Sequence, residues 1–368
     1  MSLRFCQNMR FLIANPFGIG DVLFSFPLIH AVRQFDPVGT IGYLCNARTH
    51  ELVQKKREVD WTIVFEKDEF RRSVTTAPWK GIGYCGGILT QVRRRHFDVL
   101  IDLSLGGQIS FGGWCAGIPR RIGFDYRGRG RFLTDKVPLE GFDKKPVAES
   151  YLELLRRLDI PVLSGAFSTP LLDLPDRIEY TAREYCAKQG LLFDRPFITI
   201  VPGGGASWGS QALYKQWPPA LFAEVINHLL QKHQFQVLLV GDSNDVRLCQ
   251  EVARHVSSPV QIALQVPSLL LLGAILKRSV LVIGNDSGAM HLAAGVGSQT
   301  VTIFGPVDPY VYGPFPAAAH HRVVAQSLSC QPCYQSFHLP PCPFDIACLK
   351  KLAPGEVINA AEVLLQKR

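Results

Sequence analysis

Strand-length apolar runs alternate with helix-length segments along most of the chain, and this alternation limits the possible folds more than any other feature. In the first half the runs cover residues 9–14, 40–45, 61–65 and 99–103. After a stretch rich in Pro, Ser and Gly (159–176) the pattern restarts, with runs at 197–201, 236–240, 280–283 and 300–304. Strands separated by helices predict parallel sheets covered on both faces. We therefore expect an α/β chain of two Rossmann-like halves that face each other across a cleft.

Length and composition fit this architecture. The chain has 368 residues, of which 47% are hydrophobic and 19% charged, as expected for two domains with sizeable cores. The longest apolar run, 269–276, is far shorter than the ~20 residues that span a bilayer. The first apolar run is interrupted at Asn15-Pro16, which argues against a signal peptide. We expect a cytoplasmic location.

The chain is basic. Its net charge of +8 favours anionic partners. No zinc-finger or RNA-recognition motif accompanies the charge, so we do not expect a nucleic-acid partner. One cluster, Arg93 to Arg95, is explained equally well as a solvated surface. A second cluster consists of Arg120, Arg121, Arg127, Arg129 and Arg131. Glycines and aromatic residues separate some of these arginines, which favours a loop that wraps an anion.

Four of the ten cysteines are close in sequence, at 330, 333, 342 and 348. Disulfides are improbable in a cytosolic protein. The spacing permits zinc binding, but Cys342 and Cys348 lack the close spacing of a zinc ribbon. Reduced thiols in a proline-rich loop are the preferred interpretation, and the sequence assigns no role to Cys330, Cys333, Cys342 or Cys348.

The segment from Val282 to His291 has the strongest chemical character. It predicts a buried strand, a polar turn and the start of a helix, where free backbone N–H groups and the helix dipole favour an anion. Ser287 and His291 are four residues apart and share a helix face. Asp286, Ser287, Gly288 and His291 are therefore candidate ligand-binding residues, and Asn285 or Asp286 is the expected helix cap.

A second glycine-containing turn, Gly18-Ile19-Gly20-Asp21, follows the first strand. Leu23 stands where a dinucleotide-binding fingerprint needs its third glycine, so a dehydrogenase is excluded. Asp21 opens the next helix, which we expect over residues 21–34. It is equally well explained as an acidic residue that complements the helix dipole and as an ionised general base.

Two further turns follow strands of the second half. The glycine-rich segment from Pro202 to Gly209 lacks the Lys-Ser/Thr ending of a P-loop. Lys215, just before a helix, is a candidate point charge for a phosphate, or a plain surface lysine. Asp242 is a candidate acceptor for a ribose hydroxyl, or an N-capping aspartate. No Asp-x-Asp motif follows a strand, which suggests metal-independent chemistry with no cofactor.

Taken in order, these motifs resemble glycosyltransferase family 9, the bacterial ADP-heptose:lipopolysaccharide heptosyltransferases. The resemblance runs from about residue 10 to the carboxyl terminus. It rests on Gly18-Ile19-Gly20-Asp21 with Pro27, Pro202-Gly203 with Ala206-Ser207-Trp208, Lys215-Gln216-Trp217-Pro218, Asp286-Ser287-Gly288 with His291 and Ala293-Ala294, Phe304-Gly305-Pro306-Val307-Asp308-Pro309, and Arg120-Arg121-Ile122-Gly123-Phe124.

The resemblance implies a GT-B fold with an acceptor-binding domain (1–170), a nucleotide-sugar-binding domain (171–353) and a final helix (354–368) that packs back on the first domain. It implies inverting transfer of a heptose from a nucleotide donor to an inner-core sugar, with Asp21 as general base. Ala206, Ser207 and Lys215 would hold the donor phosphates, and Asp286, Ser287, Gly288 and His291 the donor sugar and diphosphate. Gly20, Arg120 and Arg121 would serve the acceptor.

The implied partners are a nucleotide-sugar donor and an anionic lipopolysaccharide-type acceptor. A lipid-anchored acceptor requires transient contact of the monomeric enzyme with the inner face of the inner membrane. The segment from Gly203 to Tyr214 is longer and richer in glycine than the turn typical of the family, which leaves the donor sugar open. The alternatives are a relative with another donor or surface glycan, and a non-catalytic nucleotide-sugar-binding protein.

Overall fold

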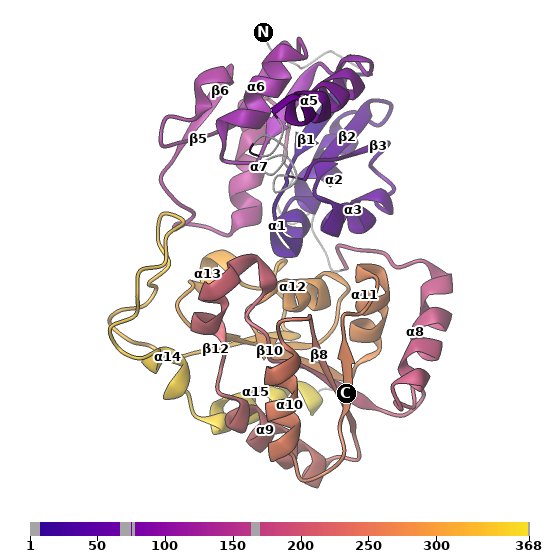
Figure 1. Ribbon diagram of the computed structural model, residues 1–368, viewed down its shortest axis with the longest axis vertical. Helices are drawn as coiled ribbons and strands as arrows, with labels where there is room; N and C mark the ends of the chain where they lie inside the picture. The colour runs from indigo at the N-terminus through magenta and orange to yellow at the C-terminus, as the bar shows by residue number, and fades with distance from the viewer. Residues whose placement is uncertain (1–7, 67–74, 76–77, 163–169, 367–368) are drawn as a thin grey trace. The chain divides into compact units, whose positions relative to one another are not determined.

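The structure is a computed structural model that describes residues 8–66, 75, 78–162 and 170–366. The chain divides into two compact units, Met1–Phe167 (unit 1) and Ser168–Arg368 (unit 2). Figure 1 draws unit 1 in indigo to magenta and unit 2 in pink to yellow. Each unit has a six-stranded sheet, and all the strand pairs of both sheets are parallel. The predicted α/β class is confirmed.

The sheet of unit 1 has the strand order β3-β2-β1-β4-β5-β6. The strands are β1 Arg10–Ala14, β2 Thr40–Cys45, β3 Trp61–Val64, β4 Val99–Asp102, β5 Arg120–Tyr126 and β6 Asp135–Leu139. The order reverses between β1 and β4, and in such sheets the ligand site lies beyond the carboxyl ends of the strands at that point. The segments after β1 and after β4 therefore flank the expected site of unit 1.

The helices of unit 1 connect these strands. They are α1 Ile19–Phe24, α2 Phe26–Phe35, α3 Ala47–Gln54, α5 Pro78–Arg93, α6 Gly107–Cys115, the 3-10 helix η1 Gly130–Phe132 and α7 Val147–Arg157. The single helix predicted over 21–34 is in fact two, separated at Ser25, because Pro27 occupies the first turn of a new helix. The first of them, α1, is short and carries Asp21 in its first turn.

The sheet of unit 2 has the strand order β12-β11-β10-β7-β8-β9. Read from the other edge, as β9-β8-β7-β10-β11-β12, this is the order of the first sheet. The predicted duplication of the architecture is thus confirmed strand by strand. The strands are β7 Phe197–Val201, β8 Gln236–Gly241, β9 Gln261–Leu264, β10 Leu281–Asn285, β11 Thr300–Phe304 and β12 His321–Ala325. Here the order reverses between β7 and β10, which pair directly. The segments after these two strands flank the expected site of unit 2.

Two groups of helices belong to this unit (Figure 1): in one, α9 contacts both α10 and α15, and in the other, α11 contacts both α8 and α12. The helices are α8 Asp176–Lys188, η2 Ala206–Lys215 (3-10), α9 Pro219–Lys232, α10 Val246–His255, α11 Leu269–Arg278, α12 Gly288–Gly295, α13 Pro309–Tyr312, α14 Ala347–Lys350 and α15 Pro354–Leu365. The helix α11 starts at Leu269, because the Ser268 side chain caps it by accepting the N–H of Leu271 at 3.1 Å.

The final helix belongs to unit 2. α15 packs on α9 and on β10, β11 and β12, and its apolar residues Val357, Ala361 and Leu364 belong to the core of unit 2. The indole N–H of Trp217 in that core donates to the Leu352 carbonyl at 3.2 Å, which fixes the approach to the helix. The carboxyl-terminal segment therefore completes unit 2. The packing of residues 354–368 on the first domain stays a prediction.

None of the helices that the structure describes combines the length and the hydrophobicity that a transmembrane segment requires.

Candidate active site

The site of unit 2 is built from the two segments that follow β7 and β10. The Lys215 Nζ lies 2.7 Å from Asp286 Oδ2, and both side chains are almost fully buried. On the other carboxylate oxygen, His291 Nε2 lies 3.4 Å from Asp286 Oδ1. These three side chains come from η2, from the turn after β10 and from α12. The structure thus brings together three of the residues predicted to bind the donor.

The electrostatics of this cluster favour an ionised Asp286. Burial alone raises the pKa of a carboxyl group, but the neighbouring Lys215 and His291 outweigh it and hold the pKa of Asp286 at about 2. Lys215 also lies over the ring of Trp208, with Nζ 4.3 Å from the ring centroid. A cation–π contact and a carboxylate together stabilise an ammonium group that burial would otherwise disfavour.

The N-cap residue of α12 is not one of the two predicted residues. We expected Asn285 or Asp286 at this position, but Ser287 is the N-cap residue, and its side chain makes no capping hydrogen bond. Its hydroxyl is buried and has no hydrogen-bond partner among the described residues. Buried hydroxyls are nearly always paired in native proteins. An unpaired hydroxyl beside free N–H groups at a helix start is suited to contact an oxygen-rich ligand.

Asn285 was missed as an organising residue. Its amide Nδ2 donates to the Pro202 carbonyl at 2.6 Å, and its Oδ1 accepts the backbone N–H of Trp217 at 3.2 Å. It therefore ties both ends of the glycine-rich segment that carries Lys215 to the end of β10. The fully buried amide of Asn285 at a strand end was the available signal.

The glycine-rich segment itself forms the 3-10 helix η2 with a kink at Gly209, where φ is 55°. Trp208 contacts Tyr334 at a ring-centroid distance of 4.9 Å, and Tyr334 contacts Tyr312 at 5.7 Å. Ser207 is exposed in this helix, and Ala206 is its first residue. The contribution of these two residues to phosphate binding stays a prediction.

Asp242 follows β8 and shapes its own turn. Its Oδ1 accepts the backbone N–H of Asn244 at 2.6 Å, and its own N–H donates to Asp245 Oδ2 at 3.1 Å. The residue that caps α10 is Asp245 and not Asp242. A ribose contact by Asp242 stays a prediction.

In unit 1 the predicted base lies beyond the carboxyl end of β1. Asp21 is half-buried in the first turn of α1, one residue after Gly20. The fully buried Asn15 fixes this segment, because its Nδ2 donates to the Asp21 carbonyl at 2.9 Å. The position is the one that the strand order of unit 1 marks for a ligand site.

The two predicted acceptor arginines lie at the opposite, amino-terminal end of the strands of the same sheet, where β5 begins. Arg120 pairs with Asp135 at 3.3 Å and donates to the Arg157 carbonyl at 3.0 Å. Arg121 donates from Nε to the Phe132 carbonyl at 2.6 Å and from Nη1 to the Ile118 carbonyl. These bonds are internal to the fold and hold β5 to its neighbours. Acceptor binding by either arginine stays a prediction that these contacts do not favour.

The comparison with known families decides the assignment. The model of glycosyltransferase family 9 (heptosyltransferase) matches residues 87–339, which is more than half of the chain. The chain belongs to this family. It is therefore a glycosyltransferase, and the resemblance inferred from the motifs is confirmed.

Individual relatives agree with the family. The glycosyltransferase is 24% identical to lipopolysaccharide heptosyltransferase 2 of Escherichia coli K12 over 309 residues, which are 82% of this chain and 84% of the relative. The family 9 glycosyltransferase of Veillonella parvula superposes with a TM-score of 0.81 at 21% identity, covering 99% of both chains. The structure of E. coli ADP-heptose lps heptosyltransferase II superposes with 0.75 at 22% identity, covering 98% of this chain and 99% of that one. The fold of this glycosyltransferase is thus GT-B, as predicted.

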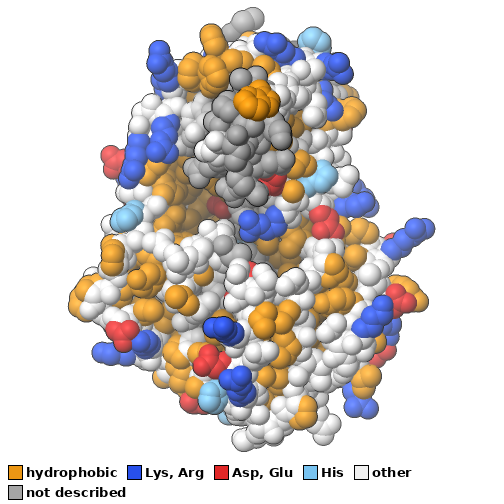
Figure 2. Space-filling view, viewed as in Figure 1, with side chains coloured by type: hydrophobic (Ala, Val, Ile, Leu, Met, Phe, Trp, Pro, Cys, Tyr) orange, Lys and Arg blue, Asp and Glu red, His pale blue; other side chains and the backbone are white. Residues whose placement is uncertain are grey.

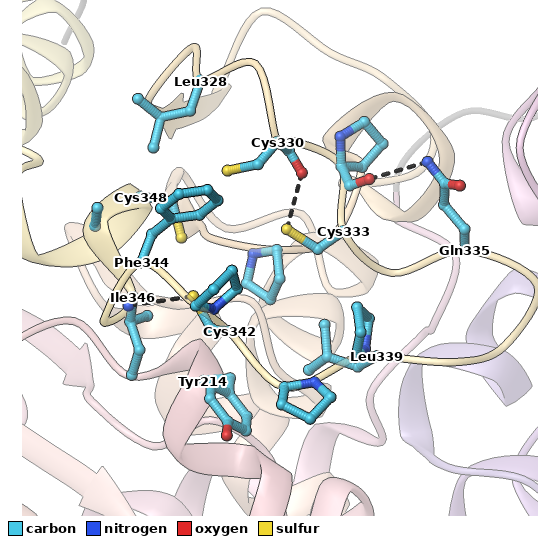
Figure 3. Close-up of a pocket in the computed structure, with 16 residues that line it drawn as sticks. Tyr214, Leu328, Cys330, Cys333, Gln335, Leu339, Cys342, Phe344, Ile346 and Cys348 are labelled. Atoms are coloured by element: carbon cyan, nitrogen blue, oxygen red, sulfur yellow. Dashed lines mark hydrogen bonds between the residues drawn. The ribbon is translucent and has the colours of Figure 1, made fainter.

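The four clustered cysteines line a pocket of about 330 Å³ in the segment between β12 and α15 (Figure 3). Cys333 Sγ contacts the Cys330 carbonyl at 2.9 Å, and Cys342 Sγ accepts the N–H of Ile346 at 3.3 Å. Over the ranges that the structure describes, no three His, Cys, Asp or Glu side chains are arranged to hold a metal ion. The same segment supports η2, because Leu339 accepts a bond from Gln211 at 3.2 Å and Tyr214 lines the pocket.

Proposed function

We propose that this glycosyltransferase moves a heptose from ADP-heptose to an inner-core sugar of lipopolysaccharide, with inversion at the anomeric carbon and without a metal ion. The observation that carries the proposal is the buried cluster of Lys215, Asp286 and His291 beside the unpaired hydroxyl of Ser287. The names of the relatives supply the donor and acceptor classes.

The donor half of the chemistry is assigned to unit 2. The N–H groups that begin α12, the Ser287 hydroxyl and His291 would contact the diphosphate, while the ionised Asp286 would accept hydrogen bonds from sugar hydroxyls. Lys215 balances the charge of Asp286, so that the diphosphate approaches a neutral pair and not a carboxylate alone. This use of fixed dipoles and an ammonium group is the alternative to a divalent ion for stabilising the leaving diphosphate.

The acceptor half is assigned to unit 1, with Asp21 as general base. In this step the Asp21 carboxylate takes the proton of an acceptor hydroxyl, whose oxygen attacks the anomeric carbon of the heptose. The bond from that carbon to the diphosphate oxygen breaks, and ADP leaves with the bonding electrons. A single displacement of this kind inverts the anomeric configuration. We place this monomeric enzyme in transient contact with the cytoplasmic face of the inner membrane.

The deciding experiment incubates the purified enzyme with ADP-heptose and a chemically defined inner-core acceptor. A mass increase of one heptose in the acceptor, with one ADP released, is the expected result, and nuclear magnetic resonance of the product gives the anomeric configuration. UDP- and GDP-sugars serve as matched controls for the donor. No transfer from ADP-heptose, or equal transfer from UDP-sugars, contradicts the proposal. Loss of turnover in excess EDTA contradicts its metal-independent part.

A further inference from the structure

The helix α6 of unit 1 has an inverted distribution of side chains. Its fully buried residues are Ser110 and Gly113, whereas Phe111 and Trp114 are 45% and 55% exposed. An ordinary surface helix turns its large apolar residues toward the core. A Cβ on Gly113 would lie 2.6 Å from a methyl group of the buried Leu100, so the helix is held too close to β4 for a large inner side chain. Ile109 packs against the core, whereas Phe111 and Trp114 are directed outward by the close packing of the helix.

The exposed rings form a cluster. Phe111 and Trp114 stack with centroids 5.9 Å apart, and Phe132 of η1 lies 4.9 Å from Phe111 and 5.7 Å from Trp114. Single exposed apolar residues are common on protein surfaces, but a contiguous apolar cluster marks an interaction site. We call Phe111, Trp114 and Phe132 the aromatic patch.

Three exposed arginines flank the aromatic patch: Arg127 and Arg129 lie in the turn between β5 and η1, and Arg131 lies in η1. Arg131 lies over the Phe132 ring, 5.8 Å from its centroid. Arg127 and Arg129 lie 5.0 and 5.5 Å from the ring centroid of Tyr126. None of the three forms an ion pair with any residue that the structure describes. Their charges are therefore available to an external anion.

The segment that carries these arginines, residues 127–131, has a fixed shape and adjoins α6. The Arg129 N–H returns to the Tyr126 carbonyl at 3.1 Å, and the Asp125 carboxylate accepts the Gly130 N–H at 2.8 Å. A Cβ on Gly107, the first residue of α6, would lie 3.1 Å from the Arg129 carbonyl, so the two elements touch. Asp125 is the single acidic residue between 103 and 134, whereas five arginines fall in that segment. Half of the net charge of the chain is concentrated there.

We propose that the aromatic patch and the arginines at 127, 129 and 131 form a docking surface for an anionic lipid bilayer. Aromatic rings insert at the boundary between headgroups and acyl chains, and arginines beside them bind anionic headgroups. The charge of the turn is complementary to such a surface, and hydrophobic and basic side chains are interspersed over the face of unit 1 that Figure 2 shows. The proposal rests on the proposed function in one respect, since a lipid-anchored acceptor brings the enzyme to the membrane.

The test measures flotation of the full chain, without donor, on two kinds of vesicle: phosphatidylcholine alone, and equal parts of phosphatidylcholine and phosphatidylglycerol. Wild type is expected to bind the anionic vesicles and to be released by salt. The double variant Phe111→Ser/Trp114→Ser should partition at least about tenfold more weakly, because two partly inserted rings are lost. Replacing the three arginines by glutamine should cost roughly a hundredfold. The matched controls Tyr180→Ser and Arg177→Gln/Arg247→Gln/Arg254→Gln change exposed residues of unit 2 and should bind as wild type does.

Equal binding of wild type and the double variant overturns the docking surface, as does equal binding to both kinds of vesicle. A further measurement separates the membrane from the acceptor sugar as the occupant. The double variant should keep wild-type transfer to a delipidated acceptor and lose transfer to an acceptor embedded in vesicles. If the double variant loses transfer equally with both acceptors, the aromatic patch binds the saccharide, and the proposal is overturned. Vesicle binding without any heptosyl transfer would instead refute the proposed function and leave the docking surface intact.

Discussion

The Lys215 ammonium lies 2.7 Å from the Asp286 carboxylate, although the two lie 71 positions apart in sequence and each side chain is 5% exposed. Their contact follows from strand order, because β7 and β10 pair directly and the two residues belong to the segments that follow them. An intact buried ion pair adds little to the free energy of unfolding. Removing one partner lowers that free energy strongly, since the remaining charge is then buried alone.

Lys215→Met is therefore expected to lower the free energy of unfolding of unit 2 by about 3–5 kcal/mol, since it leaves the Asp286 charge uncompensated. The double variant Lys215→Met/Asp286→Leu should be less destabilised than the single one, because both charges are gone. Urea denaturation measures both values. Lys350→Met breaks the exposed pair with Asp345 and serves as the control, with an expected change of less than about 1 kcal/mol. A double variant no more stable than Lys215→Met would show that the pair does not behave as a coupled unit.

The low pKa of Asp286 predicts an acid-labile contribution to stability. The folded value of about 2 is below the ordinary 3.8, so the contribution is complete above pH 4 and is lost as the pH falls toward 2. It amounts to about 2 kcal/mol. The stability difference between wild type and Asp286→Asn should therefore shrink by that amount from pH 4 to pH 2 in urea titrations. A difference that stays constant over this range contradicts the assigned cause.

Sequence patterns predicted the strands that are continuous apolar runs but not those that mix polar and apolar residues. The runs at 40–45, 197–201 and 300–304 match β2, β7 and β11 in both bounds. β5, β6, β9 and β12 were missed, because half-exposed strands mix polar and apolar residues and lack a continuous apolar run. Fold class needs only the central runs and their spacing, which is why it was predictable.

The candidate donor residues could be named from the sequence because they belong to segments that follow strands, yet their mutual contacts were not predictable. The pairing of Lys215 with Asp286 depends on which strands are neighbours, and local sequence does not encode that order. Arg120 and Arg121 show the converse, since these two members of a predicted anion-binding cluster each donate to backbone carbonyls of the same unit. Charge in a sequence does not reveal which partners the fold already provides.

The Asp102 carboxyl predicts a pH dependence of stability that is opposite in sign to that of Asp286. Burial raises the pKa of this carboxyl to about 6, although the Ser104 N–H donates to it at 2.9 Å. A folded value above the unfolded one favours the folded state at low pH, and this advantage is lost as the pH rises through 6. Asp102→Asn keeps the acceptor oxygen and removes the charge. Its stability relative to wild type should increase by about 2–3 kcal/mol between pH 4 and pH 8 in urea titrations. An unchanged difference would refute the raised pKa.

Asp21→Asn tests the proposed base. The variant keeps the size of the side chain and removes the proton acceptor, so kcat is expected to fall by about 10²–10⁴ while the affinity for ADP-heptose stays at the wild-type value. Transfer assays give the first quantity and calorimetry gives the second. Asp242→Asn is a control in unit 2 and should affect donor affinity more than kcat if Asp242 contacts the ribose. Turnover of Asp21→Asn near the wild-type rate would assign the base to another residue.

Gly204→Ala tests whether the shape of the glycine-rich segment positions Lys215. A Cβ at this position would lie 2.2 Å from the Ala212 carbonyl oxygen, which belongs to the backbone of η2 and cannot move aside alone. The substitution must therefore displace η2 and the lysine at its end, so ADP-heptose affinity should fall by about tenfold or more, as expected when a phosphate-site contact of about 1.4 kcal/mol is lost. Gly86→Ala is the control, because a Cβ there meets no atom within 4 Å and lies in helix α5. That variant should bind donor normally and gain about 0.5–1 kcal/mol of stability from better helix propensity. Normal donor affinity in Gly204→Ala would show that the position of η2 does not govern the Lys215 site.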